Sequence, residues 1–423
     1  MTDALYEAIK KYSLPYETDA NLSSVIDAIG DAKIVLLGEA SHGTSEFYTT
    51  RDEISKRLIK EKGFSMIAVE GDWPAARHVN RFIKGYEDEK LPTENILSAF
   101  DRWPTWMWNN AEVKDLIGWL KMYNDQLQIK TKVGFYGIDL YSMWESMDEV
   151  LHYLTEADPT GIDLEHAKKV VSCFEPFNRL SEHYAMSTAH FSQTCTTEAE
   201  ALFASIQRNI HLYPTEYEQR LNLKLNALVT RNAEQYYRTS LKNDVRSWNI
   251  RDEHMVEAIH ELQKSQENDA KIIVWEHNTH VGDARATTMK DEGMLNVGQL
   301  LREQHKKGDV YAIGFGTYQG TVIAANQWDA PFEVMEVPPA KEDSWESLLH
   351  EAGAYNKILI FTEDNRQYFS KWIDHRAIGV VYNPAFDSYG NYVPSIIGER
   401  YDAFIHIDET MALTPLMTKT KHQ

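Results

Sequence analysis

The sequence predicts an α/β fold, with a mostly parallel central sheet flanked by helices and a large helical insertion. Three short apolar runs each end abruptly in a glutamate or histidine, at residues 34–39, 66–70 and 272–277. Runs of this kind are typical of buried strands in a parallel sheet. Because ligands bind outside the carboxyl ends of such strands, these polar residues indicate an active site at one edge of the sheet.

The patterns divide the chain into a core and an insertion. Residues 1–141 and 267–423 alternate helical and extended patterns, which predicts one α/β core built from both ends of the chain. Residues 142–266 carry long amphipathic stretches, such as 198–212 and 216–241, without strand-like runs. We therefore expect these residues to form a helical insertion, or cap, on the core.

Glycine and proline mark the ends of the elements in the core. Helices are predicted at 21–29 and from Thr44 or Ser45 to Gly63, and Pro74 suits the first turn of a third helix. The alternation of strand and helix implies right-handed crossovers between parallel strands. The predicted strands are 34–37, 66–69, 133–138, 272–275, 310–315, 321–325, 357–361, 379–382 and 403–407.

Composition excludes several classes of partner. The 423 residues carry 43 basic and 64 acidic side chains and a formal net charge of -21, which argues against nucleic acids and anionic membranes. Cys173 and Cys195 are the only cysteines, do not make a disulfide framework and favour a reducing compartment. The chain shows no signal-peptide pattern and no apolar run near the roughly 18 residues of a membrane span. We expect a soluble cytoplasmic protein.

Glu39 and His42 lie on a turn bounded by Gly38 and Gly43, directly after the first predicted strand. The glycines allow a tight backbone path and the close approach of a ligand. The helix that begins next has free backbone N–H groups at its start. A single glutamate or histidine at a strand end is usually structural, but the pair on this turn predicts a functional site.

Two further charged residues are expected near this turn. Arg51 lies about two helical turns beyond it, where it could hold a carboxylate or supply positive charge to an oxyanion; a solvated surface arginine is the alternative. Glu70 ends the second predicted strand and could orient a histidine, as the carboxylate of a triad does. Asp72 is expected to cap the helix that begins near Pro74.

His277 and His280 follow the fourth predicted strand as a His-x-x-His motif, and two interpretations remain open. In the first, they bind a divalent metal together with other glutamates and histidines of the site. In the second, no metal takes part: one histidine is a general base toward water, and another donates to the carbonyl oxygen or to the leaving group.

Other residues are assigned by position. Trp106 and Trp108 lie in an aromatic run at 102–110, and with Trp73 they are predicted to contact the substrate; aromatic packing is the alternative. Glu276 is expected on the opposite face of its strand from His277, with a structural role. Ser41 does not lie in a Gly-x-Ser-x-Gly elbow, which argues against a serine nucleophile.

These segments resemble the erythromycin esterase family. The match rests on residues 37–43 (LGEASHG), 69–70 (VE) and 275–285 (WEHNTHVGDAR), with Arg51 between the first two. Further similar runs are 295–300, 314–318, 376–382 and 406–410. The resemblance covers nearly the whole chain and concerns the broad branch of the family rather than the dedicated antibiotic-resistance enzymes.

The resemblance implies an α/β core with a helical insertion, and ester hydrolysis without a covalent serine. The histidine matching His42 is the general base of the family, whose known substrates are macrolide antibiotics that are opened at the lactone ring. The need for metal is not uniform across the family. The residues that surround the base by this resemblance are Glu39, Arg51, Glu70, His277 and His280.

The leading hypothesis is a metal-independent carboxylic ester hydrolase that acts on a small-molecule ester or lactone and needs no cofactor. His42 deprotonates water and is oriented by Glu70, while Glu39 places a histidine or the water. The residues expected to polarise the carbonyl and stabilise the oxyanion are His277, His280 and Arg51. The alternatives are a metal-dependent hydrolase using the same residues and a non-catalytic small-molecule binding protein. The oligomeric state is not predicted.

Overall fold

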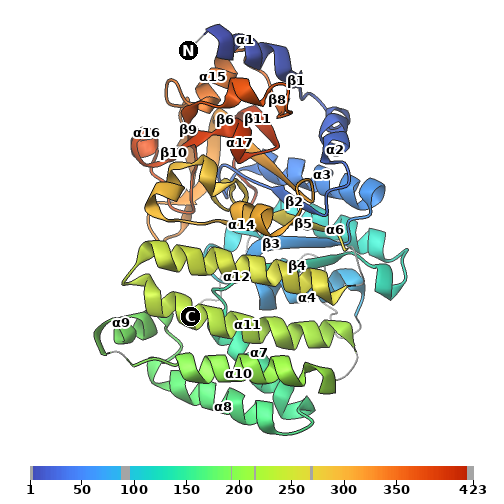
Figure 1. The fold of residues 1–423 in the computed structure, drawn as a ribbon, viewed down its shortest axis with the longest axis vertical. Coiled ribbons are helices and arrows are strands. Elements are labelled where there is room, and N and C mark those ends of the chain that lie inside the picture. The colour runs from blue at the N-terminus through green and yellow to red at the C-terminus, as the bar shows by residue number, and fades with distance from the viewer. Residues whose placement is uncertain (1–2, 87–95, 192, 214–215, 267–269, 417–423) are drawn as a thin grey trace.

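The computed structural model describes residues 3–86, 96–191, 193–213, 216–266 and 270–416, and a nine-stranded sheet lies at its centre (Figure 1). Neighbouring strands from β11 through β4 are parallel, whereas β8, β1 and β7 pair antiparallel, so the prediction of a mostly parallel sheet is confirmed. The order is β1 (Ser13–Pro15), β8 (Lys357–Ile360), β11 (Ala403–Thr410), β6 (Val310–Ala325), β2 (Ile34–Leu37), β5 (Ile272–Trp275), β3 (Met66–Asp72) and β4 (Gly134–Asp139), with β7 (Phe332–Val337) paired to β6.

The three strands that precede the predicted site lie side by side and end level with one another. Every residue of β2 and β5 is buried, as expected for strands covered by helices on both faces. Leu37 of β2 and Val69 of β3 are both paired with Trp275 of β5. The residues that follow these three positions therefore emerge at the same edge of the sheet.

The three helices predicted in the N-terminal part begin close to their predicted starts. Gly30 and Gly63 end α2 and α3 with φ values of 58° and 72°, which only glycine adopts without strain. Pro74 occupies the first turn of α4. The predicted helices are α2 (Ser23–Ile29), α3 (Ser45–Lys62) and α4 (Trp73–Lys84), and this part also contains α1 (Asp3–Tyr12) and α6 (Ala111–Asn124), which were not predicted.

The insertion is helical and packs against the sheet. In Figure 1, α12 lies beside the strands, and α11, α10 and α8 follow at increasing distance from them. One cluster of buried apolar side chains runs from Ile34, Ala68 and Ile272 of the sheet into these helices, so core and insertion share a hydrophobic core. The insertion contains α7 (Met143–Ala157), α8 (Ile162–Phe174), α9 (Ser181–Phe191), α10 (Thr196–Asn209), α11 (Tyr217–Ser240) and α12 (Asp244–Ser265).

One strand prediction in the C-terminal part is wrong and two others merge. Residues 310–315 and 321–325 are in strands as predicted, but they belong to one continuous strand, β6, which pairs in turn with β2, β11 and β7 along its length. Gly320, in the polar middle of β6, allows the strand to continue beside β11, because a Cβ atom there would meet the Thr410 carbonyl oxygen at 2.0 Å. Residues 379–382 form no strand and contribute one isolated bridge, between Val381 and Ala325. A chain segment without continuous neighbours cannot form a ladder, whatever its β-propensity.

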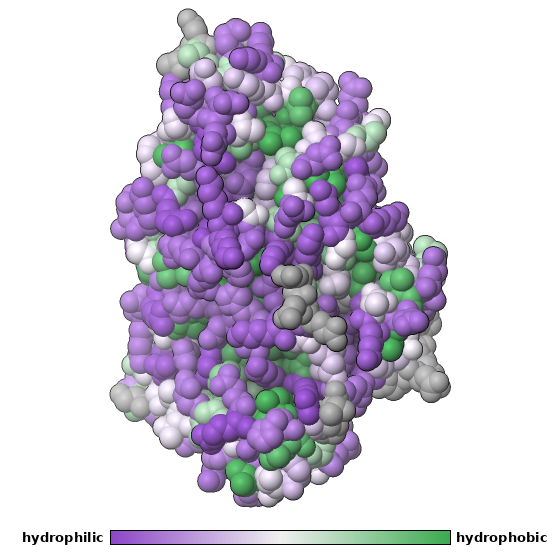
Figure 2. All heavy atoms as spheres, turned by 45° about the vertical axis from the view of Figure 1, so that its right-hand side comes forward, coloured by the Kyte–Doolittle hydropathy of each residue, from purple (hydrophilic) through white to green (hydrophobic). Residues whose placement is uncertain are grey.

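The remaining elements come from the C-terminal part of the chain. Strands β9 and β10 form a separate antiparallel pair that the apolar pattern did not predict. Hydrophilic residues cover most of the face seen in Figure 2, in keeping with the acidic composition. In the described ranges, none of the helices has the length and apolar character that crossing a bilayer requires. These elements are α13 (Asn278–Val281), α14 (Val297–Gln304), α15 (Trp345–Glu351), β9 (Trp372–Arg376), α16 (Asp387–Gly390), β10 (Tyr392–Ile396) and α17 (Ile397–Arg400).

The two cysteines form a disulfide, which the sequence did not predict and which weakens the expectation of a reducing compartment. Cys173 lies near the end of α8, and Cys195 directly precedes α10. The packing of these helices brings the two residues together, although nothing in their spacing signals it. Because disulfides persist in oxidising surroundings, the cysteines no longer support a reducing compartment.

We expect the disulfide to stabilise the insertion. It closes a loop with a sequence separation of 22 residues, and a cross-link of that span lowers the entropy of the unfolded chain by roughly 3 kcal/mol in free energy. The double variant Cys173→Ala/Cys195→Ala should lose about that free energy of unfolding in urea titrations. The reduced wild type is the matched control. Equal stability of the variant and the oxidised wild type would contradict this expectation.

Candidate functional site

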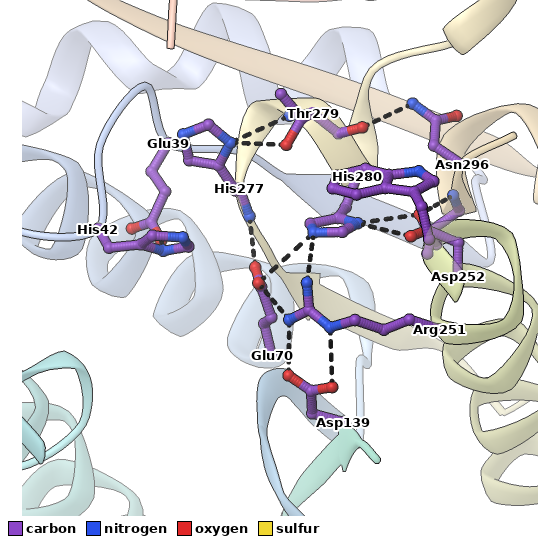
Figure 3. A network of polar contacts seen from close by, with 12 residues as sticks. Glu39, His42, Glu70, Asp139, Arg251, Asp252, His277, Thr279, His280 and Asn296 are labelled. Atoms are coloured by element: carbon purple, nitrogen blue, oxygen red, sulfur yellow. Dashed lines mark hydrogen bonds and ion pairs between the residues drawn. The ribbon is translucent and has the colours of Figure 1, made fainter. Parts of the chain in front are cut away.

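The predicted residues meet at the level edge formed by β2, β5 and β3 (Figure 3). Glu39 and His42 follow β2, His277 and His280 follow β5, and Glu70 lies within β3. All are buried, and His42 is the most exposed of them, at 8%. The sheet therefore brings together residues that are more than 200 positions apart in the chain.

His42 is oriented by Glu39 rather than by Glu70, which corrects the role predicted for Glu70. Its Nδ1 lies 2.8 Å from Glu39 Oε1, and because a carboxylate only accepts, Nδ1 carries the proton. This tautomer leaves the lone pair of the imidazole on Nε2. The ring of His277 lies beside it, with 4.9 Å between the ring centroids.

Arg51 holds the carboxylate oxygen of Glu39 that does not bond to His42. Its Nη2 donates to Glu39 Oε2, and its side chain is fully buried. The guanidinium carbon lies 4.4 Å from the ring centroid of Tyr48 and 4.5 Å from that of Trp275. Of the two roles predicted for Arg51, the structure supports the one that holds a carboxylate, since this guanidinium is enclosed by protein.

Glu70 connects strand β3 to the segment that begins at His277 and to helix α12, which carries Arg251. Its Oε2 accepts from the backbone N–H of His277 at 2.9 Å, and its Oε1 accepts from Arg251 Nη2 at 2.7 Å. The indole N–H of Trp108 donates to the backbone carbonyl of Glu70 at 3.1 Å. Glu70 therefore positions the start of the His277 segment and affects His42 through its charge.

His277 presents an unused donor. Its Nδ1 lies 2.8 Å from Thr279 Oγ1 and accepts from the Thr279 backbone N–H at 3.3 Å, which places the proton on Nε2. This Nε2 is buried and has no hydrogen-bond partner of normal geometry among the described residues, although a backbone contact with Ala40 raises the pKa of the ring. Buried donors without partners are rare and often belong to functional sites.

His280 has no free nitrogen, which corrects its predicted role toward the carbonyl of a substrate. Its Nδ1 donates to Asp252 Oδ1 at 2.9 Å. Its Nε2 lies 3.0 Å from Arg251 Nη1, and because a guanidinium only donates, Nε2 accepts this bond. The ring also stacks on Trp248, with centroids 4.6 Å apart. His280 is a positioning residue.

Three residues of this network escaped the sequence analysis. Arg251 and Asp252 come from α12 of the insertion, and Asp139 ends β4. Arg251 binds Asp139 with two hydrogen bonds, Nε to Oδ1 at 3.0 Å and Nη2 to Oδ2 at 2.6 Å. The position of Asp139 after an apolar run was a usable signal. A helical pattern does not say which partner a buried arginine meets.

The two facing imidazoles have opposite pKa shifts. Burial lowers the pKa of His42, but the charge of Glu70 and the hydrogen bond and charge of Glu39 outweigh it, so the pKa is raised above 6.5. Burial and then the neighbouring His42 hold the pKa of His277 well below 6.5. Pairs of groups whose pKa values are moved apart in this way are typical of acid–base sites.

The three tryptophans predicted to contact the substrate are packing residues. Trp73 and Trp106 are each 2% exposed and Trp108 is 5% exposed. Trp73 donates to Asn222 Oδ1 of the insertion at 2.9 Å, and Trp108 packs behind Glu70. The structure thus favours the alternative of aromatic packing between helices and sheet.

Other assigned residues differ from expectation in detail. Asp72 pairs with Arg102 at 2.7 Å instead of capping α4 through its side chain. Ser41 is hydrogen-bonded to Thr44. Glu276 is buried, and no described residue bonds its carboxyl oxygens; burial, and then the charges of nearby carboxylates, raise its pKa well above 4.5.

The donors of the site do not fit a divalent metal. The described residues contain no group of three or more His, Cys, Asp or Glu side chains placed to hold one. The acids that could serve are already paired with arginines, Glu39 with Arg51 and Glu70 with Arg251. That the chain needs no cofactor stays a prediction.

The chain is similar in sequence to known proteins over most of its length. The sequence pattern of the family described as erythromycin esterase matches residues 59–410. The putative hydrolase YbfO of Bacillus subtilis (strain 168) is 24% identical over 401 residues, covering 89% of this chain and 83% of that protein. Erythromycin esterase type II of Escherichia coli is 23% identical over 359 residues, covering 79% of this chain and 81% of that protein.

A solved structure shares the fold. It is a mutant of erythromycin esterase EreC in its open conformation, with a TM-score of 0.63, 16% identity, and coverage of 93% of this chain and 94% of that chain. At this identity the likeness concerns the fold alone. The family pattern, in contrast, spans most of the sequence, and the protein belongs to the erythromycin esterase family.

Proposed function

We propose that this protein hydrolyses an ester or a lactone with a water molecule that His42 activates. The observation that carries the proposal is the pair of facing imidazoles, one with a free lone pair on Nε2 and a raised pKa, the other with an unpartnered N–H and a lowered pKa. Family membership and the names of the relatives support a hydrolase.

In the proposed mechanism, His42 is the general base. Its Nε2 takes a proton from water while Nδ1–H stays bonded to the carboxylate of Glu39. The imidazolium that forms is stabilised by the negative charges of Glu39 and Glu70. Arg51 keeps the carboxylate of Glu39 in position during this step.

His277 is the proposed electrophile. Its neutral ring donates Nε2–H to the carbonyl oxygen of the substrate, which becomes an oxyanion when the hydroxide attacks the carbonyl carbon. When the tetrahedral intermediate collapses, the carbon–oxygen bond to the leaving group breaks, and the alkoxide takes the proton from His42. The products are a carboxylic acid and an alcohol, which remain in one molecule when the substrate is a lactone.

Erythromycin is the first substrate to test, since a relative carries its name. The proposed chemistry concerns the reacting carbonyl, so simple esters form the second group. Lactone opening adds the mass of one water molecule to the substrate, which mass spectrometry detects directly.

Removing the general base should abolish most activity. We expect His42→Ala to lower kcat by about 10²–10⁴-fold, the range for loss of a positioned base. Its circular dichroism should match the wild type. The matched control is His152→Ala, because the His152 side chain is 73% exposed on α7. Unchanged turnover in His42→Ala would rule out the mechanism.

Removing the electrophile should act on kcat rather than on KM. His277→Phe keeps a ring but has no N–H, and the loss of one oxyanion donor costs about 10²–10³-fold in kcat. Initial rates over a range of substrate concentrations separate the two constants. A rise in KM with full kcat would show that His277 serves binding alone.

The pH dependence of kcat/KM should report His42. A general base works only when it is neutral, so activity falls as the pH drops below the raised pKa of His42. In Glu39→Gln one of the two carboxylates that raise this pKa is gone, and the acid limb of the profile moves to lower pH. Glu156→Gln, a change at a side chain that is 71% exposed, is the control. An unmoved acid limb in Glu39→Gln would contradict the assignment.

A further inference from the structure

Arg251 occupies the centre of the polar network in Figure 3. Its side chain is 12% exposed and reaches three partners at once. One nitrogen, Nη2, lies 2.7 Å from Glu70 Oε1 and 2.6 Å from Asp139 Oδ2, and Nη1 lies 3.0 Å from His280 Nε2. A single cation therefore joins the ends of β3 and β4 to the segment that follows β5.

The partners of Arg251 belong to the residue types that serve as metal ligands in proteins. Two carboxylates and an imidazole nitrogen converge on the guanidinium, and Asp252 fixes the far side of that imidazole, as outer carboxylates do for metal-bound histidines. A guanidinium is permanently charged and presents several donors in a fixed plane. It can therefore neutralise and orient this set of acceptors without a metal.

We propose that Arg251 takes the place of a divalent metal ion at this site, as a cation built into the chain that holds Glu70 and His280 in position. Arg251 is then a positioning residue. It fixes Glu70, whose other oxygen holds the backbone N–H of His277, and so it sets the place of the proposed electrophile. The kinetic part of this proposal rests on the hydrolase function proposed above, whereas its metal-binding part does not.

The proposal explains why the metal interpretation of the His-x-x-His motif does not fit the structure. His280 would be the first ligand of such a metal, but Arg251 donates to the very nitrogen that would coordinate it. Glu70, the next candidate, is likewise held by Arg251. In this protein the cation is the guanidinium of Arg251, which belongs to helix α12 of the insertion. It stands where a metal-dependent enzyme would bind an ion from solution.

Metal uptake tests the substitution directly. Arg251→Ala removes the cation and leaves Glu70, Asp139 and His280 facing an opening. Titrated with Zn²⁺ alone in a calorimeter, this variant should bind one more ion per chain than the wild type does. Arg246→Ala, on the same helix, is the matched control, because its pairing with Glu253 lies at the surface. Adding Asp139→Asn to Arg251→Ala should abolish the extra site.

Equal Zn²⁺ uptake by the wild type, Arg251→Ala and Arg246→Ala would overturn the proposal. Arg251→Met keeps the test available if the alanine variant does not fold, because its aliphatic chain still packs near Tyr141, over which the guanidinium now lies. The visible spectrum of bound Co²⁺ gives a second readout of the same site.

Kinetics test the positioning role. We expect Arg251→Ala to lose about 10–100-fold in activity, the range for loss of an outer positioning group, and free guanidinium to restore part of it where equal KCl does not. The charged groups facing His42 are Glu39, Glu70 and Arg251, and the titratable ring of His277 lies beside it. Since the charge of Arg251 lowers the pKa of His42, its removal should move the acid limb of the pH profile to higher pH.

Arg251→Lys keeps the charge and should keep the wild-type acid limb while losing activity, because an ammonium cannot bridge all three partners. If Arg251 had a purely structural role, replacing it with alanine would not shift the acid limb of the pH profile, and free guanidinium would not restore activity. If the wild type hydrolyses no ester, the proposed function fails, and Zn²⁺ uptake alone decides the role of Arg251.

Discussion

The level register of β2, β5 and β3 is the constraint on which the site depends. Leu37 and Val69 both pair with Trp275, so the residues that follow them leave the sheet at one height. These strands are buried on both faces, which fixes their register, since a slip by one residue would turn every side chain to the opposite face. The side chains that follow these strand ends can contact one another only because the three backbones end at the same level.

Charge compensation then determines what the buried acids do. Glu39 is paired with Arg51 and Glu70 with Arg251, and both pairs persist beside His42 because breaking a buried ion pair is costly. Glu276 lies within range of the same charges without a described cation bonded to it, and its pKa is raised well above 4.5. The buried glutamates near His42 thus differ in whether an arginine is bonded to them, and the glutamate without one has the raised pKa.

Much of this could be predicted from sequence because strand ends are local signals. An apolar run that stops at Glu39 or His277 identifies the strand, the edge and the chemistry together. The exact partner of a side chain is a matter of a few ångströms, so Glu39 could not be told from Glu70 as the residue that orients His42. Arg251 and the Cys173–Cys195 bond depend on helix packing within the insertion, which no local pattern records.

Helix α12 contributes side chains to the site, so the insertion does more than cover it. The consecutive residues Arg251 and Asp252 bind different partners: the first binds the acids of β3 and β4, and the second binds His280 and the backbone N–H of Val297. A small rotation of α12 would disturb both contacts together. Helices α8 and α10 lie farther from the sheet in Figure 1 and carry no such contact with these residues. The outer helices can therefore vary with little effect on the site, whereas the sequence and orientation of α12 are constrained by its chemistry.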